Sequence, residues 1–148
     1  MRVVLQRVTE ARVSQVDISP HRVAAIGQGL VLLAGFQSAD DSTVLRWMAE
    51  KCAGLRVFED EAGAMNLALS DVGGAVLVVP NFTLYGDARK GRRPSFTAAA
   101  APELAQALFD EFVTCLAATG VPVQAGFFQT HMQVEIHNDG PITLVLER

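Results

Sequence analysis

The stretch Asn138-Asp139-Gly140-Pro141-Ile142-Thr143 stands between two strand-like runs, and the rest of the sequence is organised around it. Glycine accepts positive φ, aspartate can hydrogen-bond its own backbone, and proline fixes φ and lacks an N–H, so the cluster predicts a rigid, exposed turn. A plain hairpin connection is the simplest interpretation of such a turn. Whether that interpretation is sufficient depends on the remainder of the chain.

The run before this turn alternates strictly between apolar and polar residues. His131, Glu135 and His137 share the polar face of the predicted strand. The two histidines are six positions apart, which is roughly 20 Å at the rise of a strand, and one metal ion cannot bridge that distance. We therefore expect a solvated polar face and no metal site. Residues 142–146 form the predicted last strand.

The opening part of the chain predicts four short strands, at residues 3–8, 11–16, 22–26 and 30–34. The most strand-like run of all covers residues 75–79, which are uniformly apolar. Shorter strands are expected at residues 56–58 and 122–125.

Two helices are expected between these strands. Asp40, Asp41 or Ser42 can cap a first helix, in which apolar residues recur at three- and four-residue spacing through Leu55. Pro102 fits the first turn of a second helix. The pattern predicts an α+β fold, a sheet sandwich or barrel-like and mainly antiparallel β structure with two packed helices, and a single domain over residues 1–148.

The composition is that of a globular protein: half of the 148 residues are hydrophobic and 19% are charged. The apolar runs are too short to span a bilayer and no signal peptide is recognisable, so a cytoplasmic location and no membrane partner are expected. Cys52 and Cys115 are interpreted as reduced, buried thiols, with neither a disulfide nor a metal site.

Net charge is −4, which excludes a protein that coats nucleic acid through overall charge. The basic residues are unevenly spread, however. Arg89, Lys90, Arg92 and Arg93 fall within five positions around Gly91, with no acid among them. Such a cluster is either a solvated loop or a local contact for a phosphate backbone.

Common catalytic motifs are absent. The sequence has no Gly-x-Ser-x-Gly nucleophile elbow, no Gly-x-x-x-x-Gly-Lys phosphate loop and no complete dinucleotide fingerprint, so no cofactor is expected. Thr83 follows the strand that ends near Pro80. A catalytic threonine needs a base, and no partner is evident near it in the sequence.

Several stretches nevertheless share an order and spacing over the whole chain. They are Met1-Arg2-Val3-Val4-Leu5-Gln6-Arg7-Val8, Leu55-Arg56-Val57-Phe58-Glu59-Asp60, Met65-Asn66-Leu67, Asp71-Val72-Gly73-Gly74, Phe82-Thr83-Leu84-Tyr85, Arg89-Lys90-Gly91-Arg92-Arg93-Pro94-Ser95-Phe96, Met132-Gln133-Val134 and the Asn138 to Thr143 stretch. In these motifs the chain resembles the D-aminoacyl-tRNA deacylase family.

The resemblance implies a homodimer that hydrolyses the ester of D-amino acids, and also of glycine, on tRNA. It implies that the Gly140-Pro141 peptide is cis and reaches from one subunit into the pocket of the other. There the backbone carbonyls would block any side chain of L configuration and let glycine pass. No cofactor and no metal are implied.

The resemblance also implies a substrate pocket formed by Pro80, Asn81, Phe82 and Met132. Thr83 is then a positioning or oxyanion-side residue, with nucleophilic attack as the alternative, and the vicinal hydroxyl of the terminal ribose can help to activate water. The basic residues Arg89, Lys90, Arg92 and Arg93 would contact tRNA phosphates.

The sequence departs from the family pattern at the pocket. Pro80-Asn81 stands where Ser-Gln is usual before Phe-Thr-Leu, and Phe128-Gln129-Thr130 replaces Phe-Gly-Ala. Two alternatives therefore stay open. One is a sibling deacylase with altered specificity, and the other is a protein that binds the tRNA end without catalysis.

Overall fold

One long strand, β1 (Arg2–Gln15), forms the spine of the sheet in the computed structural model, which describes residues 1–148. Along one edge it pairs antiparallel with β8 (Met132–Glu147) over nearly its full length. The other edge is shared by β3 (Gly29–Gly35) and β2 (Val23–Ile26). The two separate strands predicted at the start of the chain are thus wrong, because both segments pair with β8 as one strand.

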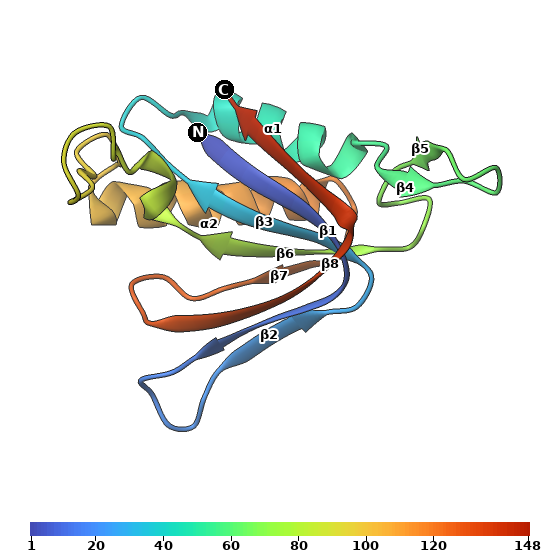
Figure 1. Cartoon of the computed structure of the whole chain (residues 1–148), viewed down its shortest axis with the longest axis horizontal. Helices are drawn as coiled ribbons and strands as arrows, with labels where there is room; N and C mark the ends of the chain where they lie inside the picture. The colour runs from blue at the N-terminus through green and yellow to red at the C-terminus, as the bar shows by residue number, and fades with distance from the viewer.

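The stretch predicted as a turn lies inside β8. Val8 of β1 pairs with Asn138, and the register between the two strands shifts on each side of Val8. Gly140 has a φ of +120°, and the Gly140-Pro141 peptide is cis. Figure 1 shows β8 turning sharply at this irregularity. A plain hairpin is therefore wrong, since the two halves of β8 pair with β1 and not with each other.

The rest of the sheet is parallel. β6 (Ala75–Pro80) runs parallel to β3, and β7 (Val123–Ala125) runs parallel to β6. β2 lies against β6 and β7, so the sheet curls into a nearly closed barrel. The predicted α+β fold with a barrel-like sheet is confirmed, with parallel pairs added to the antiparallel ones. The buried runs of β3 and β6 suit strands that are covered on both faces.

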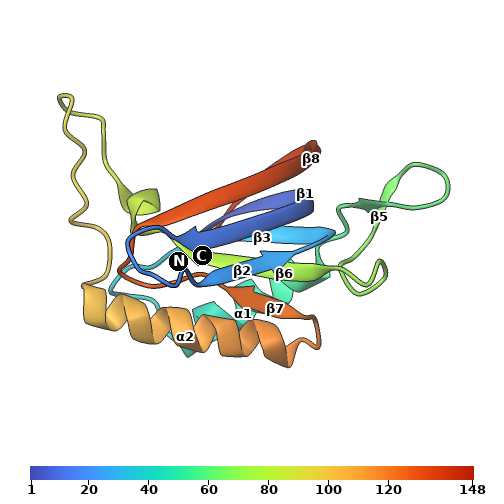
Figure 2. The ribbon, with the colours of Figure 1, turned by 90° about the horizontal axis from the view of Figure 1, so that it is seen from below.

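Two helices, α1 (Ser42–Gly54) and α2 (Pro102–Ala118), cover one face of the sheet, as Figure 2 shows. Asp41 caps α1, because its carboxylate accepts hydrogen bonds from two backbone N–H groups of the first turn. Asp40 is buried and instead binds the amino group of Met1 at 2.5 Å. Pro102 occupies the first turn of α2, as predicted.

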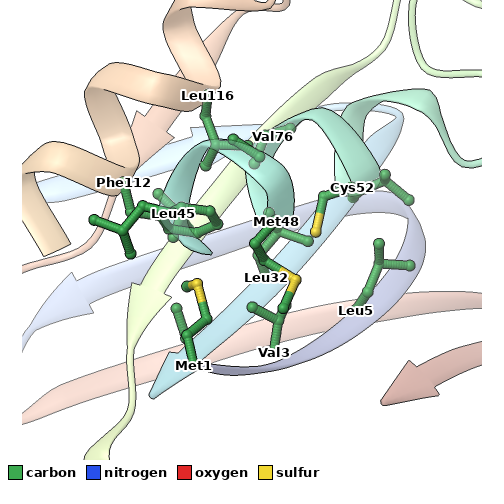
Figure 3. Packing of buried hydrophobic residues seen from close by; sticks show 14 of the residues in the cluster. Met1, Val3, Leu5, Leu32, Leu45, Met48, Cys52, Val76, Phe112 and Leu116 are labelled. Carbon is green, nitrogen blue, oxygen red and sulfur yellow. The ribbon is translucent and has the colours of Figure 1, made fainter. Parts of the chain in front are cut away.

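The main core lies between the sheet and these helices (Figure 3). Cys52 of α1 is fully buried there, and burial raises the pKa of its thiol to about 12. Cys115 of α2 is only partly buried, so the prediction of two buried thiols holds for one of them. A smaller cluster fills the inside of the barrel and includes Val31, Leu77 and Phe127.

A short hairpin of β4 (Phe58–Glu59) and β5 (Met65–Leu67) projects from the barrel at the end where β8 turns (Figure 1). None of the helices has the length and apolar composition needed to cross a membrane.

Candidate active site

A cavity of about 610 Å³ opens where the parallel strands β3 and β6 end. The carboxyl ends of parallel strands are a common place for ligand sites. Its walls come from these strand ends, the start of α2 and the connection from β7 to β8. The lining residues are Ala34, Phe36, Pro80, Asn81, Phe82, Phe96, Ala99, Ala100, Ala101, Pro102, Ala105, Phe127, Phe128, Gln129, Thr130 and Met132.

The lining of this cavity is aromatic and uncharged. Five phenylalanines contribute to it, and the polar side chains are those of Asn81, Gln129 and Thr130. No Asp, Glu, His, Lys, Arg, Cys or Tyr is among the lining residues. The cavity thus favours apolar or planar groups and contains no side chain suited to general acid–base chemistry near neutral pH.

The segment after β6 forms a short 3-10 helix, η1 (Phe82–Tyr85), beside the cavity. Pro80 ends the strand, and the Asn81 N–H donates to the carbonyl of Ala34 at 2.8 Å. The N–H groups of Phe82 and Thr83 open the helix and donate to no atom of the chain. They are two preorganised donors available to a bound oxygen atom.

Thr83 is held by its neighbour. Its hydroxyl donates to the Asn81 side-chain oxygen at 2.5 Å. Asn81 lines the cavity, whereas Thr83 is exposed and does not line it. The acceptor of the Thr83 hydroxyl proton is therefore an amide oxygen, which does not act as a general base near neutral pH.

Met132, at the start of β8, closes the opposite wall. Its sulfur accepts the Phe127 N–H at 3.3 Å. Gly126 permits this packing, because a Cβ there would lie 3.3 Å from Pro80 Cδ and 3.4 Å from Met132 Sδ. The fold therefore brings together the predicted pocket residues Pro80, Asn81, Phe82 and Met132.

The mouth of the cavity carries an aromatic pair. Phe82 is 58% exposed and Phe96 is 38% exposed, and their ring centroids lie 5.2 Å apart in an edge-to-face arrangement. A Cβ on Gly86 would lie 2.8 Å from the Phe96 ring, so glycine lets the ring rest on the backbone. Phe96 belongs to the Arg-Pro-Ser-Phe run, but no pattern in the sequence marks it as a pocket residue.

Gln129 belongs to the Phe128-Gln129-Thr130 segment at which the sequence departs from the family pattern at the pocket. It lines the cavity and is the only non-glycine residue with positive φ, at +51°. Left-handed backbone favours glycine, which is the usual residue here in the family pattern.

The basic cluster forms a loop beside the mouth, closed by paired backbone hydrogen bonds between Asp87 and Ser95. Arg89 binds Asp87 at 2.6 Å, and these hydrogen bonds lower the pKa of the Asp87 carboxyl. Lys90, Arg92 and Arg93 have no ion-pair partner. None of the four basic residues lines the cavity.

Gly140 and Pro141 do not line the cavity of their own chain. Asn138 is six residues beyond Met132 along β8, roughly 20 Å at the rise of a strand. In Figure 1 the sharp turn of β8 lies at the opposite end of the sheet from the segment after β6. The structure thus separates these two predicted residues from the other four.

Side chains beneath the turn of β8 contact the residues that flank Gly140. The buried guanidinium of Arg7 places Nε 2.9 Å from an oxygen of Asp139 and donates from Nη1 to the carbonyl of Val57 at 2.7 Å. The side-chain amide of Asn138 donates to the carbonyl of Ile142 at 2.9 Å. These contacts hold in place the exposed corner of β8, which is formed by Gly140 and Pro141.

The histidines of the polar face are exposed. His131 lies 3.6 Å from Asp17, and His137 lies 3.0 Å from Glu10. No three His, Cys, Asp or Glu side chains come together as a metal-binding group.

An uncharged aromatic cavity at the ends of parallel strands, in a barrel-like α+β fold, is typical of a protein that binds a small ligand or the end of a larger one. The chain belongs to the D-Tyr-tRNA(Tyr) deacylase family, whose model matches residues 4–147.

Relatives of known name match this chain in sequence over almost its whole length. The chain is 54% identical to the D-aminoacyl-tRNA deacylase of Thermomicrobium roseum over 147 residues, covering 99% of this chain and 94% of that protein. The identity to the D-aminoacyl-tRNA deacylase of Heliobacterium modesticaldum is also 54%, covering 99% and 96%.

Two solved structures share the fold. The c-Myc DNA unwinding element binding protein matches with a TM-score of 0.90 and 37% identity, covering 100% of this chain and 99% of that one. A probable eukaryotic D-amino acid tRNA deacylase matches with a TM-score of 0.83 at 20% identity, covering 98% and 97%. The second likeness concerns the fold alone.

Proposed function

We propose that this chain, acting as one cytoplasmic domain, hydrolyses the ester bond of D-aminoacyl-tRNA and of glycyl-tRNA. The observation that carries the proposal is the cavity itself. It offers aromatic surface for a terminal adenosine, two free N–H donors at its edge and no ionisable side chain. The names of the relatives support the substrate class.

In the proposed reaction the ester carbonyl oxygen approaches the N–H groups of Phe82 and Thr83. These donors stabilise the negative charge that develops when water adds to the carbonyl carbon. The vicinal ribose hydroxyl assists deprotonation of that water. The carbon–oxygen ester bond then breaks, the ribose oxygen takes up a proton, and the free amino acid and tRNA leave.

Selection by configuration is proposed to require a homodimer. Gly140 and Pro141 lie far along β8 from their own cavity, so in this proposal a second copy of the chain supplies them. Their carbonyls would occupy the space that the side chain of an L-amino acid requires. The α-hydrogen, which a D-amino acid places in the same position, would still fit. Glycine then escapes rejection because it has no side chain.

The proposal is tested by single-turnover deacylation of matched D-, L- and glycyl-tRNA against a control without enzyme. Fast loss of the D and glycyl esters with the L ester spared is the expected result. Hydrolysis of a small L ester would identify the sibling enzyme with altered specificity. Rates at or below the control would identify a protein that binds the tRNA end without catalysis.

Thr83 gives a first prediction about mechanism. Removing its hydroxyl in Thr83→Ala frees the Asn81 side chain and loosens the start of η1, so the single-turnover rate is expected to fall about tenfold or more. Thr83→Ser keeps the hydrogen bond to Asn81 and is expected to retain most of the rate. A nucleophilic role would instead abolish turnover in Thr83→Ala, and full rates in both variants would exclude both roles.

The basic loop gives a second prediction. Arg92→Ala removes an unpaired charge, so the slope of log affinity for tRNA against log salt concentration should decrease by about one. Arg89→Ala is the matched control, since its charge is already compensated by Asp87. We expect a smaller change of slope in that variant. Identical slopes in both variants and in the wild type would rule out phosphate contacts by this loop.

A further inference from the structure

A second cavity, of about 390 Å³, adjoins the first and shares two of its residues, Phe127 and Phe128. It lies between the ends of β1 and β2, the side of α2 and the connection from β7 to β8. In Figure 2 the end of β1, the start of β2 and the connection from β7 to β8 lie toward the end of the molecule where α2 begins. A ligand that extends from the first cavity into the second would therefore pass over Phe127 and Phe128.

The second cavity differs from the first in being polar. Arg22 lines it, is exposed, takes part in no ion pair and holds its guanidinium carbon 4.6 Å from the centroid of the Phe127 ring. Gln106 and Asp110 of α2 also line it, and the Gln106 amide donates to the Asp110 carboxylate at 3.0 Å, so this carboxylate is already engaged by a donor. A guanidinium beside amide groups is the set of donors that binds phosphate and the edge of a base.

Gln15 adds an unsatisfied acceptor. The residue is only 6% exposed and lines the second cavity, and its side-chain oxygen has no hydrogen-bond donor. A buried polar atom without a partner is unfavourable, so a ligand that donates a hydrogen bond to it gains binding energy.

We propose that the second cavity binds the nucleotide that precedes the terminal adenosine of tRNA. This inference rests on the proposed function, which places the terminal adenosine in the first cavity. Arg22 holds the phosphate that joins the two nucleotides, Phe127 separates their bases, and Gln15 accepts a hydrogen bond from the preceding base. Every tRNA ends in CCA, and cytosine carries the exocyclic amine that this acceptor requires, whereas uracil presents an oxygen there.

Three ligands that cannot be hydrolysed test this assignment by calorimetry on the full-length protein. The first is 3′-(D-alanylamino)-3′-deoxyadenosine, and the other two extend it at the 5′ position with cytidylate or uridylate. The cytidylyl ligand is expected to bind about tenfold more tightly than the nucleoside, and the uridylyl ligand to lose most of that gain. In Arg22→Ala the affinity advantage of the cytidylyl ligand over the nucleoside ligand should fall severalfold, while the affinity for the nucleoside ligand itself should not change.

Arg12→Ala is the matched control, because Arg12 is an exposed arginine of β1 that lines neither cavity. It should leave all three affinities unchanged. Gln15→Leu should make the cytidylyl and uridylyl ligands equal, and the unchanged affinity for the nucleoside shows that this buried variant is folded.

Equal binding of the nucleoside and cytidylyl ligands overturns the inference while leaving the proposed function intact. A gain that survives in Arg22→Ala overturns it as well. If the nucleoside ligand itself fails to bind, the proposed function fails and the second cavity loses its assignment with it.

Discussion

A Gly140→Ala variant is expected to hydrolyse D-aminoacyl-tRNA about 100-fold more slowly than the wild type while remaining folded. The φ of +120° at this position is one that side-chain-bearing residues rarely adopt. A Cβ would also lie 2.8 Å from Ile142 Cγ1 and 3.0 Å from the Ile142 nitrogen, so the exposed corner of β8 has to move. In the proposed dimer this corner forms part of the partner's pocket, and a displacement of about 1 Å there costs on the order of 100-fold in rate.

Gly63→Ala is the matched control for this substitution. Gly63 also has positive φ, at +76°, but nothing lies within 4 Å of a Cβ built there. Both variants are expected to lose about 1–3 kcal/mol of unfolding free energy through backbone strain. Only Gly140→Ala should lose activity, and it should also raise the relative rate on the L ester. If the two variants match in rate and in selectivity, the corner of β8 has no part in the site.

Phe112→Ala is expected to have the largest effect on stability, about 3–5 kcal/mol of unfolding free energy. The ring is fully buried between α2 and the sheet and contacts Phe36 edge to face, with centroids 6.3 Å apart. For a chain of this size the unfolding midpoint measured by calorimetry should fall by about 10 °C or more. Because Phe36 lines the first cavity, the affinity for the nucleoside ligand should fall as well.

Leu104→Ala on the same helix serves as the control, since Leu104 is 40% exposed. We expect its unfolding free energy to change by roughly 0.5 kcal/mol or less. A similar loss of unfolding free energy in both variants would mean that the aromatic contact of Phe112 contributes no more to stability than an exposed side chain of α2.

Local sequence signals predicted the elements of the fold well where one residue decides the structure. Asp41 and Pro102 begin the helices as expected, and the uniformly apolar run of β6 is a covered parallel strand. The continuity of β1 could not be predicted, because residues 9–10 are exposed and polar, yet the pairing with β8 resumes at Glu10, which lies opposite His137. Pairing between distant strands decided that element.

The site was predictable only in part. Pro80, Asn81, Phe82 and Met132 were identified through the resemblance, and the fold brings them to one cavity. Phenylalanines such as Phe36 and Phe127 carry no sequence signal that separates a cavity wall from a core. Their role emerges only from the point where β3, β6 and α2 meet.

The pairing of β1 with β8 has a consequence for synthesis. Arg2 pairs with Glu147, so β1 acquires one whole edge only after β8, which is distant in sequence, has left the ribosome. Contacts so far apart in sequence form slowly, and an unpaired strand edge is prone to association with other chains. During translation β1 is therefore a long open edge, and chains that stall before residue 132 should be the ones that aggregate or recruit chaperones.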